Sequence, residues 1–456
     1  MKDVVVRIAG IEIVNIKNVS YGKIELQGNQ LAVDSEMKAD ILGIYGQNGS
    51  GKTAVIEILE FLKKLMSGNF LPPEIQDYIT KDSNEAECKF SFWIKHKKEA
   101  FNCDYSFKIK HFEKSTYITK EKLSYKNCTG EDKKVNLEYR VENEEYLFTP
   151  QYRFNEFIQN DQARRIDVAV AKKLAMKECR SFFFSDEVIK LSETSDIPDL
   201  SKILMSLKDY AFKNIFIIKN IHCGVINLNL AMPFSFKQKN AEKDVFGDLA
   251  VSLMEPSVFP QKEFDLLTEI VSSINLVVKA LIPDMALVIH NYGKQMTAEG
   301  DEGIRFEMLS QRNDQLIPLK YESEGIKKIL SVLNMLIAVY NLPGICVAID
   351  ELDAGVYEYL LGELLEVLEK SGKGQLIFTS HNLRPLEMIH KSSLVFTTTN
   401  DKNRYIRFSN VKSNNNMRDV YLRSINLGGQ SEEIYAATSD FEISRAFRKA
   451  GRLVND

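Results

Sequence analysis

The sequence has no C-x-x-C pair, although it contains six cysteines. Their wide scatter argues against a zinc ribbon, a zinc hook or a disulfide framework. Free thiols are typical of proteins in a reducing compartment. We therefore expect a cytoplasmic protein.

Long apolar runs are absent as well. Nowhere do about 18 apolar residues follow one another without interruption, which is the length of a candidate membrane-spanning helix. The apolar stretch near the start is too short for the hydrophobic part of a signal peptide. The sequence thus predicts no membrane partner, and any role in transport would need a separate membrane subunit.

Charge of one sign is not in excess, because 59 Lys and Arg face 63 Asp and Glu, for a formal net charge of -4. This balance gives no support to a protein that coats polyanions. The 456 residues are 44% hydrophobic and 27% charged, which are ordinary globular values. No internal repeat period and no sustained heptads occur, so we expect no long coiled-coil arms.

The apolar pattern predicts an α/β fold in three divisions. Loose alternation over residues 11–26 and period two over residues 87–146 favour antiparallel strands, while apolar runs at residues 41–45, 345–349 and 376–379 favour buried strands. Helical spacing dominates from about residue 151 to 281, apart from a strand at 215–218. The predicted divisions are an N-terminal half with a β subdomain (1–150), a mainly helical insertion (151–282) and a C-terminal half (283–456).

The clearest motif lies between the strand at 41–45 and a helix that begins near residue 54. It reads G-Q-N-G-S-G-K-T and matches the phosphate-loop pattern in the strand-loop-helix setting that the pattern requires. Glycines let backbone N–H groups point at phosphate oxygens, and the helix adds its positive N-terminal end. The motif predicts a triphosphate site with Mg²⁺ at Thr53 and with phosphate contacts from Lys52 and its neighbours. The phosphate-binding candidates are Gly46, Asn48, Gly49, Ser50, Gly51, Lys52 and Thr53.

Two acids follow the apolar strand at 345–349. Asp350 is placed to hold Mg²⁺, and Glu351 to polarise the attacking water as a general base. About 30 residues further on, His381 follows the strand at 376–379 and is a candidate for sensing the γ-phosphate. Each of these features alone is also found in solvated strand ends, but their order after a phosphate loop favours the functional interpretation.

With Glu322-Ser323-Glu324-Gly325 opening a helix before these acids, the order of motifs resembles an ABC-type ATPase. Within that superfamily the sequence is similar to the SMC-like and overcoming-lysogenization-defect branch of bacterial ATP-binding proteins. The resemblance covers the first 70 residues and about 284–400. It implies a phosphate-loop head, ATP and Mg²⁺ as ligands, and two composite ATP sites in a head-to-tail homodimer or higher oligomer.

In such proteins the signature serine and glycine contact the γ-phosphate held by the other subunit, which points to Ser323 and Gly325 here. A helix N-terminus favours a phosphate anion. The alternative for Ser323 is an ordinary helix N-cap with Glu324 in the first turn. The segment departs from the transporter consensus, which makes a transporter ATPase a poor match. Asp353 occupies the place of the acid that links the two sites.

Three further positions are assigned by the same resemblance. Lys17 and Asn18 correspond to a strand edge near the phosphates, with a solvated strand end as the alternative. Gln151 is the candidate glutamine ligand of Mg²⁺, with a surface glutamine as the alternative. Basic groups at residues 95–98, 108–111, 164–165 and 172–173 are typical of solvated faces, but related ATPases contact duplex DNA from comparable surfaces.

The resemblance implies an ATPase that acts as a dimerising sensor or scaffold, similar to the anti-phage defence ATPases of the Septu and PARIS types, with a separate nuclease or toxin as effector. No acidic cluster after His381 resembles that of a fused TOPRIM nuclease. One alternative is an SMC-like ATPase that clamps duplex DNA in maintenance or repair. Another is a structural protein that binds ATP without hydrolysing it.

Overall fold

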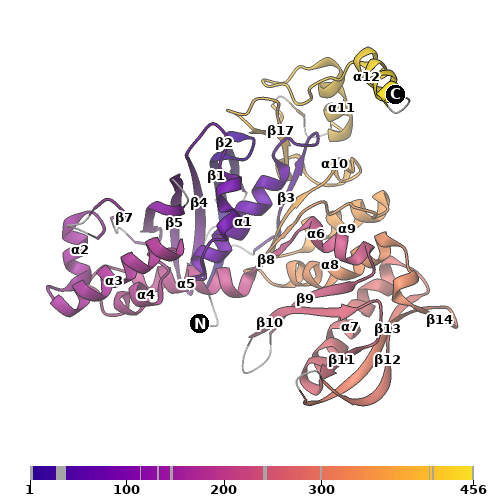
Figure 1. Ribbon diagram of the computed structural model, residues 1–456, viewed down its shortest axis with the longest axis horizontal. Coiled ribbons are helices and arrows are strands. Elements are labelled where there is room, and N and C mark those ends of the chain that lie inside the picture. The colour runs from indigo at the N-terminus through magenta and orange to yellow at the C-terminus, as the bar shows by residue number, and fades with distance from the viewer. Residues whose placement is uncertain are drawn as a thin grey trace.

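The computed structural model describes residues 4–26, 37–112, 115–130, 133–143, 147–239, 244–297, 300–409, 411–412 and 415–453. Within this part of the chain, two six-stranded sheets lie on either side of helix α1 (Lys52–Met66). A smaller lobe of strands and helices extends from them (Figure 1). None of the helices seen here is both long and apolar enough to cross a membrane.

The first sheet is antiparallel and has the order β2-β1-β4-β5-β6-β7. Alternate residues of its strands are buried, as the period-two pattern predicts. The predicted strand pair at residues 11–26 and the predicted sheet over 87–146 are both confirmed. The strands are β1 (Val4–Ile16), β2 (Val19–Glu25), β4 (Glu85–His96), β5 (Glu99–Phe112), β6 (Ser115–Asn127) and β7 (Val135–Arg140).

The second sheet has the order β18-β17-β3-β16-β15-β8, and all its pairings are parallel except that of β17 with β18. Its central strands are buried on both faces, which explains their uninterrupted apolar sequences. Parallel strands end at one edge of the sheet, so the residues that follow them are brought together. The strands are β3 (Asp40–Tyr45), β8 (Ile215–Ile218), β15 (Cys346–Ile349), β16 (Gln375–Thr379), β17 (Leu394–Thr397) and β18 (Tyr405–Ile406).

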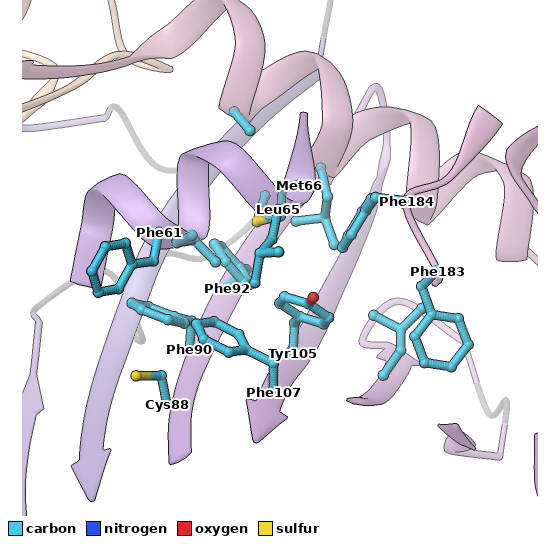
Figure 2. Packing of buried hydrophobic residues seen from close by; sticks show 14 of the residues in the cluster. Phe61, Leu65, Met66, Cys88, Phe90, Phe92, Tyr105, Phe107, Phe183 and Phe184 are labelled. Carbon is cyan, nitrogen blue, oxygen red and sulfur yellow. The ribbon is translucent and has the colours of Figure 1, made fainter. Parts of the chain in front are cut away.

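Helix α1 shares one hydrophobic cluster with both sheets. Figure 2 shows Phe61, Leu65 and Met66 of α1 facing the aromatic side chains of β4 and β5, among them Phe90 and Tyr105. Complete burial of one such side chain contributes about 1.5–3 kcal/mol. This packing fixes the helix that follows the phosphate loop, and with it the orientation of the loop.

Helices α2 to α5 pack into the same cluster as the antiparallel sheet. The helical spacing over residues 154–176 belongs to two helices, because Gln159 and Asn160 adopt positive φ angles between them. The following strand β8 lies in the parallel sheet beside β15. The domain boundaries predicted after residues 150 and 282 remain a prediction. The helices are α2 (Gln151–Ile158), α3 (Gln162–Glu178), α4 (Asp186–Ser192) and α5 (Leu200–Asn214).

The smaller lobe has its own hydrophobic cluster, which α8 (Glu324–Asn341) shares. It contains a hairpin of β9 and β10 at residues 231–252 that the sequence analysis did not predict. The sequence pattern that indicates this hairpin is the alternation of Met232, Phe234 and Phe236, all of which are buried. The remaining elements are α6 (Asn220–Asn227), β9 (Ala231–Lys239), β10 (Asp244–Ser252), β11 (Ser257–Pro260), α7 (Gln261–Leu281), β12 (Met285–Met296), β13 (Glu302–Arg312) and β14 (Gln315–Pro318).

The other face of the parallel sheet is covered by α8, α9, α10 and α11, which share a third cluster with it. The predicted fold class, an α/β phosphate-loop ATPase fold with an antiparallel β subdomain, is confirmed. The C-terminal helices are α9 (Glu358–Ser371), α10 (Pro385–Met388), α11 (Met417–Leu427) and α12 (Asp440–Leu453). Short 3₁₀ helices are η2 (Pro73–Tyr78), η3 (Leu319–Tyr321) and η4 (Lys391–Ser393).

Candidate functional site

A cavity of about 450 Å³ opens where β3, β15 and β16 end. Its volume is that of a small-molecule site. The phosphate loop, both strand-end acids and the predicted switch histidine all line it. The lining residues are Lys17, Asn18, Asn48, Gly49, Ser50, Gly51, Lys52, Thr53, Ala54, Asp350, Glu351, Thr379 and His381.

The phosphate loop depends on glycine at its last turn. Gly51 caps α1 with a left-handed backbone (φ 92°), and a Cβ there would lie 2.8 Å from Cγ2 of Val19. The loop is also held from outside, because Asn18 Nδ2 donates to the carbonyl of Gly49 and Tyr405 Oη donates to that of Gly51 (2.8 Å). These contacts preset the curled backbone that an anionic phosphate needs.

Lys52 lies inside this curl with only 6% of its surface exposed. Its Nζ donates to the carbonyls of Gly46 and Gln47, both at 2.9 Å. Burial lowers the pKa of the ammonium, and the neighbouring carboxylate of Asp350 opposes that shift. A buried cation that donates to neutral carbonyls is a strong site for a phosphate oxygen.

Asp350 and Thr53 meet at the base of the cavity. Thr53 Oγ1 lies 3.3 Å from Asp350 Oδ1, which also accepts a 2.6 Å hydrogen bond from Thr379 Oγ1. Carboxylate and hydroxyl oxygens are the ligands that Mg²⁺ prefers. The residues present therefore fit a magnesium ion completed by phosphate and water oxygens. Thr379 belongs to this group, although the sequence analysis did not single it out.

Glu351 has a left-handed backbone (φ 49°), which is unfavourable for a residue with a side chain. The conformation is held by a 2.8 Å hydrogen bond from its N–H to Thr379 Oγ1. Strain of about 1–3 kcal/mol persists only where the surroundings enforce it. The structure thus holds the general-base candidate at the wall of the cavity in a defined backbone conformation.

His381 is connected to Asp353, since its N–H donates to Oδ2 of that residue at 3.1 Å. Partial burial, and then the Lys52 ammonium, lower the pKa of the imidazole below its ordinary value. Near neutral pH the ring is therefore uncharged and has one N–H to donate and one nitrogen to accept. This suits hydrogen bonding to a phosphate next to a lysine that already carries the positive charge.

Lys17 lines the same cavity from the tip of the β1-β2 hairpin. Its Nζ forms a 2.6 Å ion pair with Glu57 and lies 4.6 Å from the ring centre of Tyr78. The structure thus brings Lys17 and Asn18 to the loop, as the resemblance implies. Asn18 also holds the loop to the hairpin through Gly49, and Lys17 holds α1 to it through Glu57.

The signature residues do not line this cavity. Ser323 is exposed and caps α8, its Oγ accepting from the N–H of Ile326 at 3.3 Å. Gly325 is buried, and a Cβ there would lie 1.9 Å from the carbonyl oxygen of Gly355. Glycine at this position allows the start of α8 to touch the turn after Glu351. The exposed Ser323, two residues before it, is not among the residues that line the cavity.

Gln151 also lies outside the cavity. It is the first residue of α2, which packs against α3 and α4 at the far end of the antiparallel sheet (Figure 1). The geometry does not support a magnesium ligand there. The strand that runs beside Asp350 is instead β8, because the N–H of Asp350 donates to Ile218 O at 2.9 Å. Residues after β8, Lys219 and Asn220, are the ones at this edge of the sheet.

Several residues of the basic clusters form hydrogen bonds or ion pairs within the fold. Arg164 is 9% exposed and donates to Leu191 O at 3.0 Å. Lys108 forms a 2.5 Å ion pair with Glu85. Lys172 donates to backbone carbonyls near β7. Several basic side chains that were candidates for contact with duplex DNA are therefore bonded to other parts of the chain.

A comparison with curated proteins found no match. Among solved structures, the Smc head domain with an extended coiled coil from Pyrococcus furiosus is 12% identical, with a TM-score of 0.40, covering 88% of this chain and 96% of that one. The SMC head domain from Thermotoga maritima is 12% identical (TM-score 0.38; 88% and 98% covered). The recombination mediator protein RecF bound to ATP is 13% identical (TM-score 0.33; 83% and 94% covered). Similarity at this level carries no conclusion about activity.

The comparison with protein families gives a clearer result. The model described as AAA ATPase domain matches residues 7–384, which include the phosphate loop, both strand-end acids and His381. The match covers well over half of the chain, and the chain therefore belongs to the AAA ATPase domain family.

Proposed function

We propose that two copies of this chain bind ATP between them in the manner of ABC-type heads and hydrolyse it to ADP and phosphate. One observation carries the proposal. A single chain gathers a phosphate loop, a magnesium-type acid and a general-base candidate around one cavity, while its exposed helix start at Ser323 lies outside that cavity. A second copy can bring Ser323 to the open side.

Binding falls to the phosphate loop. Lys52 exchanges its two carbonyl partners for β- and γ-phosphate oxygens, and the N-terminus of α1 adds backbone donors. Thr53 and Asp350 would hold Mg²⁺, which neutralises phosphate charge when bound. Asn18 keeps the loop closed through its contact with Gly49.

Hydrolysis falls to the strand-end residues. A water oxygen attacks the γ-phosphorus, the bond to the β-γ bridging oxygen breaks, and Glu351 accepts a proton from the water. The uncharged His381 ring donates a hydrogen bond to the γ-phosphate. Because the backbone N–H of His381 is bonded to Asp353, the presence of that phosphate is coupled to the turn between β15 and α9.

The biological role we propose is that of a sensor or scaffold in anti-phage defence, of the Septu or PARIS type, in which the ATP-bound dimer controls a separate nuclease or toxin. Support comes from the motif order quoted above. The alternative is an SMC-like clamp on duplex DNA. The structural partners of Arg164 and Lys108 weigh against it.

The test is a variant that binds ATP without hydrolysing it. Glu351→Gln removes the proton acceptor but keeps the shape of the side chain, so it should form a long-lived dimer with Mg²⁺ and ATP and remain monomeric without nucleotide. Sedimentation velocity with a phosphate-release assay measures both properties. Glu269→Gln on the exposed face of α7 is the matched control. A monomer at saturating ATP would contradict the dimer, and unchanged phosphate release would contradict the role of Glu351.

A further inference from the structure

The C-terminal part of the chain is attached to the phosphate loop by a hydrogen bond. Ala436 donates its N–H to Gln47 Oε1 at 2.8 Å, and Gln47 is the second residue of the phosphate-loop motif. Just before it, Glu432 accepts hydrogen bonds from Asn400 (3.0 Å) and Asn403 (2.9 Å). Residues 432–453, called the C-terminal arm below, are thus fixed at one end beside the candidate ATP site.

The other end of the C-terminal arm is helix α12, which does not bury its apolar side. Residues 440–450 are all exposed, with 43% of Ile443 and 76% of Phe447 accessible. Together with Ala446 and Ala450 these residues lie on one face, at the i, i+3, i+4, i+7 spacing of an amphipathic helix. Figure 1 shows α12 at the edge of the molecule beyond α11. An ordered helix with an open apolar face needs a partner surface.

The opposite face of α12 is basic. Arg445, Arg448 and Lys449 follow one another around the helix, whereas the acids Asp440 and Glu442 are confined to its first turn. The partner surface should therefore combine apolar and acidic groups.

Helix α9 carries such a surface. Its outer stripe exposes Tyr359 (47%) and Val367 (53%) on either side of the exposed Glu363. The helix holds four glutamates and one lysine. It also follows the turn at Gly355 that touches the start of α8, so the beginning of α9 lies near the helix start that Ser323 caps.

We propose that the C-terminal arm of each copy crosses to the second copy of this chain and docks α12 on the outer face of its α9. This inference rests on the proposed ATP-bound dimer, which places the phosphate loop of one chain against the Ser323 face of the other. The arm starts at the first of these surfaces, and α9 belongs to the second. Through Gln47, docking of the arm is linked to the loop that holds the phosphates.

The experiment uses the full chain with Glu351→Gln, Mg²⁺ and ATP, and compares it with the same protein lacking residues 440–456. Loss of α12 from both chains should weaken dimerisation by about tenfold or more, as expected for removal of large apolar contacts. ATP bound per chain at saturating ATP and the melting temperature of the nucleotide-free monomer should not change, because α12 is exposed within its own chain. Equal dimer stability with and without α12 would overturn the proposal.

Charge reversal tells docking across the dimer from docking within one chain. Arg445→Glu/Arg448→Glu and Glu363→Lys/Glu366→Lys should each weaken dimerisation, and an equimolar mixture of the two variants should restore it. In the mixed dimer each arm meets an α9 of opposite charge. Arg423→Glu on the exposed side of α11 is the matched control and should have no effect.

Three other outcomes would each contradict either this proposal or the proposed dimer. Recovery only when all four reversals are in one chain would show docking within that chain and overturn the proposal. Loss of DNA or effector binding with unchanged dimerisation would assign α12 to that partner and also overturn it. A full-length Glu351→Gln protein that stays monomeric with ATP would instead refute the dimer of the proposed function.

Discussion

The two surfaces that the proposed dimer joins are completed to different degrees within one chain. On the phosphate-loop side, Lys52, Thr53 and Asp350 already contact their neighbours in a cavity shaped for an anion. On the α8 side, Ser323 caps a helix and is exposed to solvent. The phosphate-loop side can bind nucleotide within one chain. The exposed Ser323 side can act on a nucleotide only when a second chain brings the two sides together. Nucleotide binding and hydrolysis should therefore respond differently to changes on the two sides.

The largest expected effect is on binding, from Lys52→Ala. The change removes a buried charge that hydrogen-bonds to phosphate, which costs about 3 kcal/mol, or about 100-fold in affinity. Isothermal titration with ATP and Mg²⁺ measures it. Lys64→Ala is the matched control, because Lys64 lies on the same helix and pairs with Glu60 on its outer side. Tight ATP binding by Lys52→Ala would refute the phosphate-loop site.

The α8 side is tested by a change that leaves binding intact. Ser323→Asp keeps an oxygen that can cap α8 but places a negative charge where the partner's γ-phosphate would lie. We expect a folded protein that binds ATP normally and hydrolyses it at the background rate. Ser323→Asn, which caps without the charge, should stay closer to the unchanged protein.

Mixing sharpens this test. Ser323→Asp and Lys52→Ala are each inactive alone, but their heterodimer has one site with both residues intact. Random pairing in a two-fold dimer then restores about a quarter of the ATPase activity. A mixture with no recovery, although heterodimers form, would mean that Ser323 does not complete the site of the other chain.

Much of the phosphate-loop side could be predicted from sequence, because its residues are local. The glycine loop is one uninterrupted segment, and Asp350, Glu351 and His381 each follow an apolar strand that brings them to a common edge. Residues that depend on packing were harder to find. Thr379 is a buried threonine like many others until its hydroxyl is seen between Asp350 and the N–H of Glu351.

Gly325, on the α8 side, is another residue whose structural role depends on packing and cannot be predicted from the sequence. The resemblance assigns it to phosphate contact, whereas the structure adds a reason within one chain, namely its approach to Gly355. Gly325→Ala should therefore lower the free energy of unfolding by about 1–3 kcal/mol through overpacking. Urea denaturation measures it. Gly224→Ala is the control, since a Cβ in α6 meets nothing within 4 Å there and should be neutral or slightly stabilising.

The smallest expected effect is that of Gln151→Ala. Sequence reasoning placed this glutamine at the magnesium because it follows a β region and opens a helical one, but position along the chain does not fix which strand lies beside Asp350. That strand is β8, more than 60 residues further on. We therefore expect Gln151→Ala to leave the Mg²⁺ concentration for half-maximal ATP hydrolysis unchanged, whereas Thr53→Ala raises it. A raised Mg²⁺ requirement for Gln151→Ala would mean that α2 moves to the cavity when nucleotide binds, and that the phosphate-loop side is less completely formed in the single chain than its hydrogen bonds indicate.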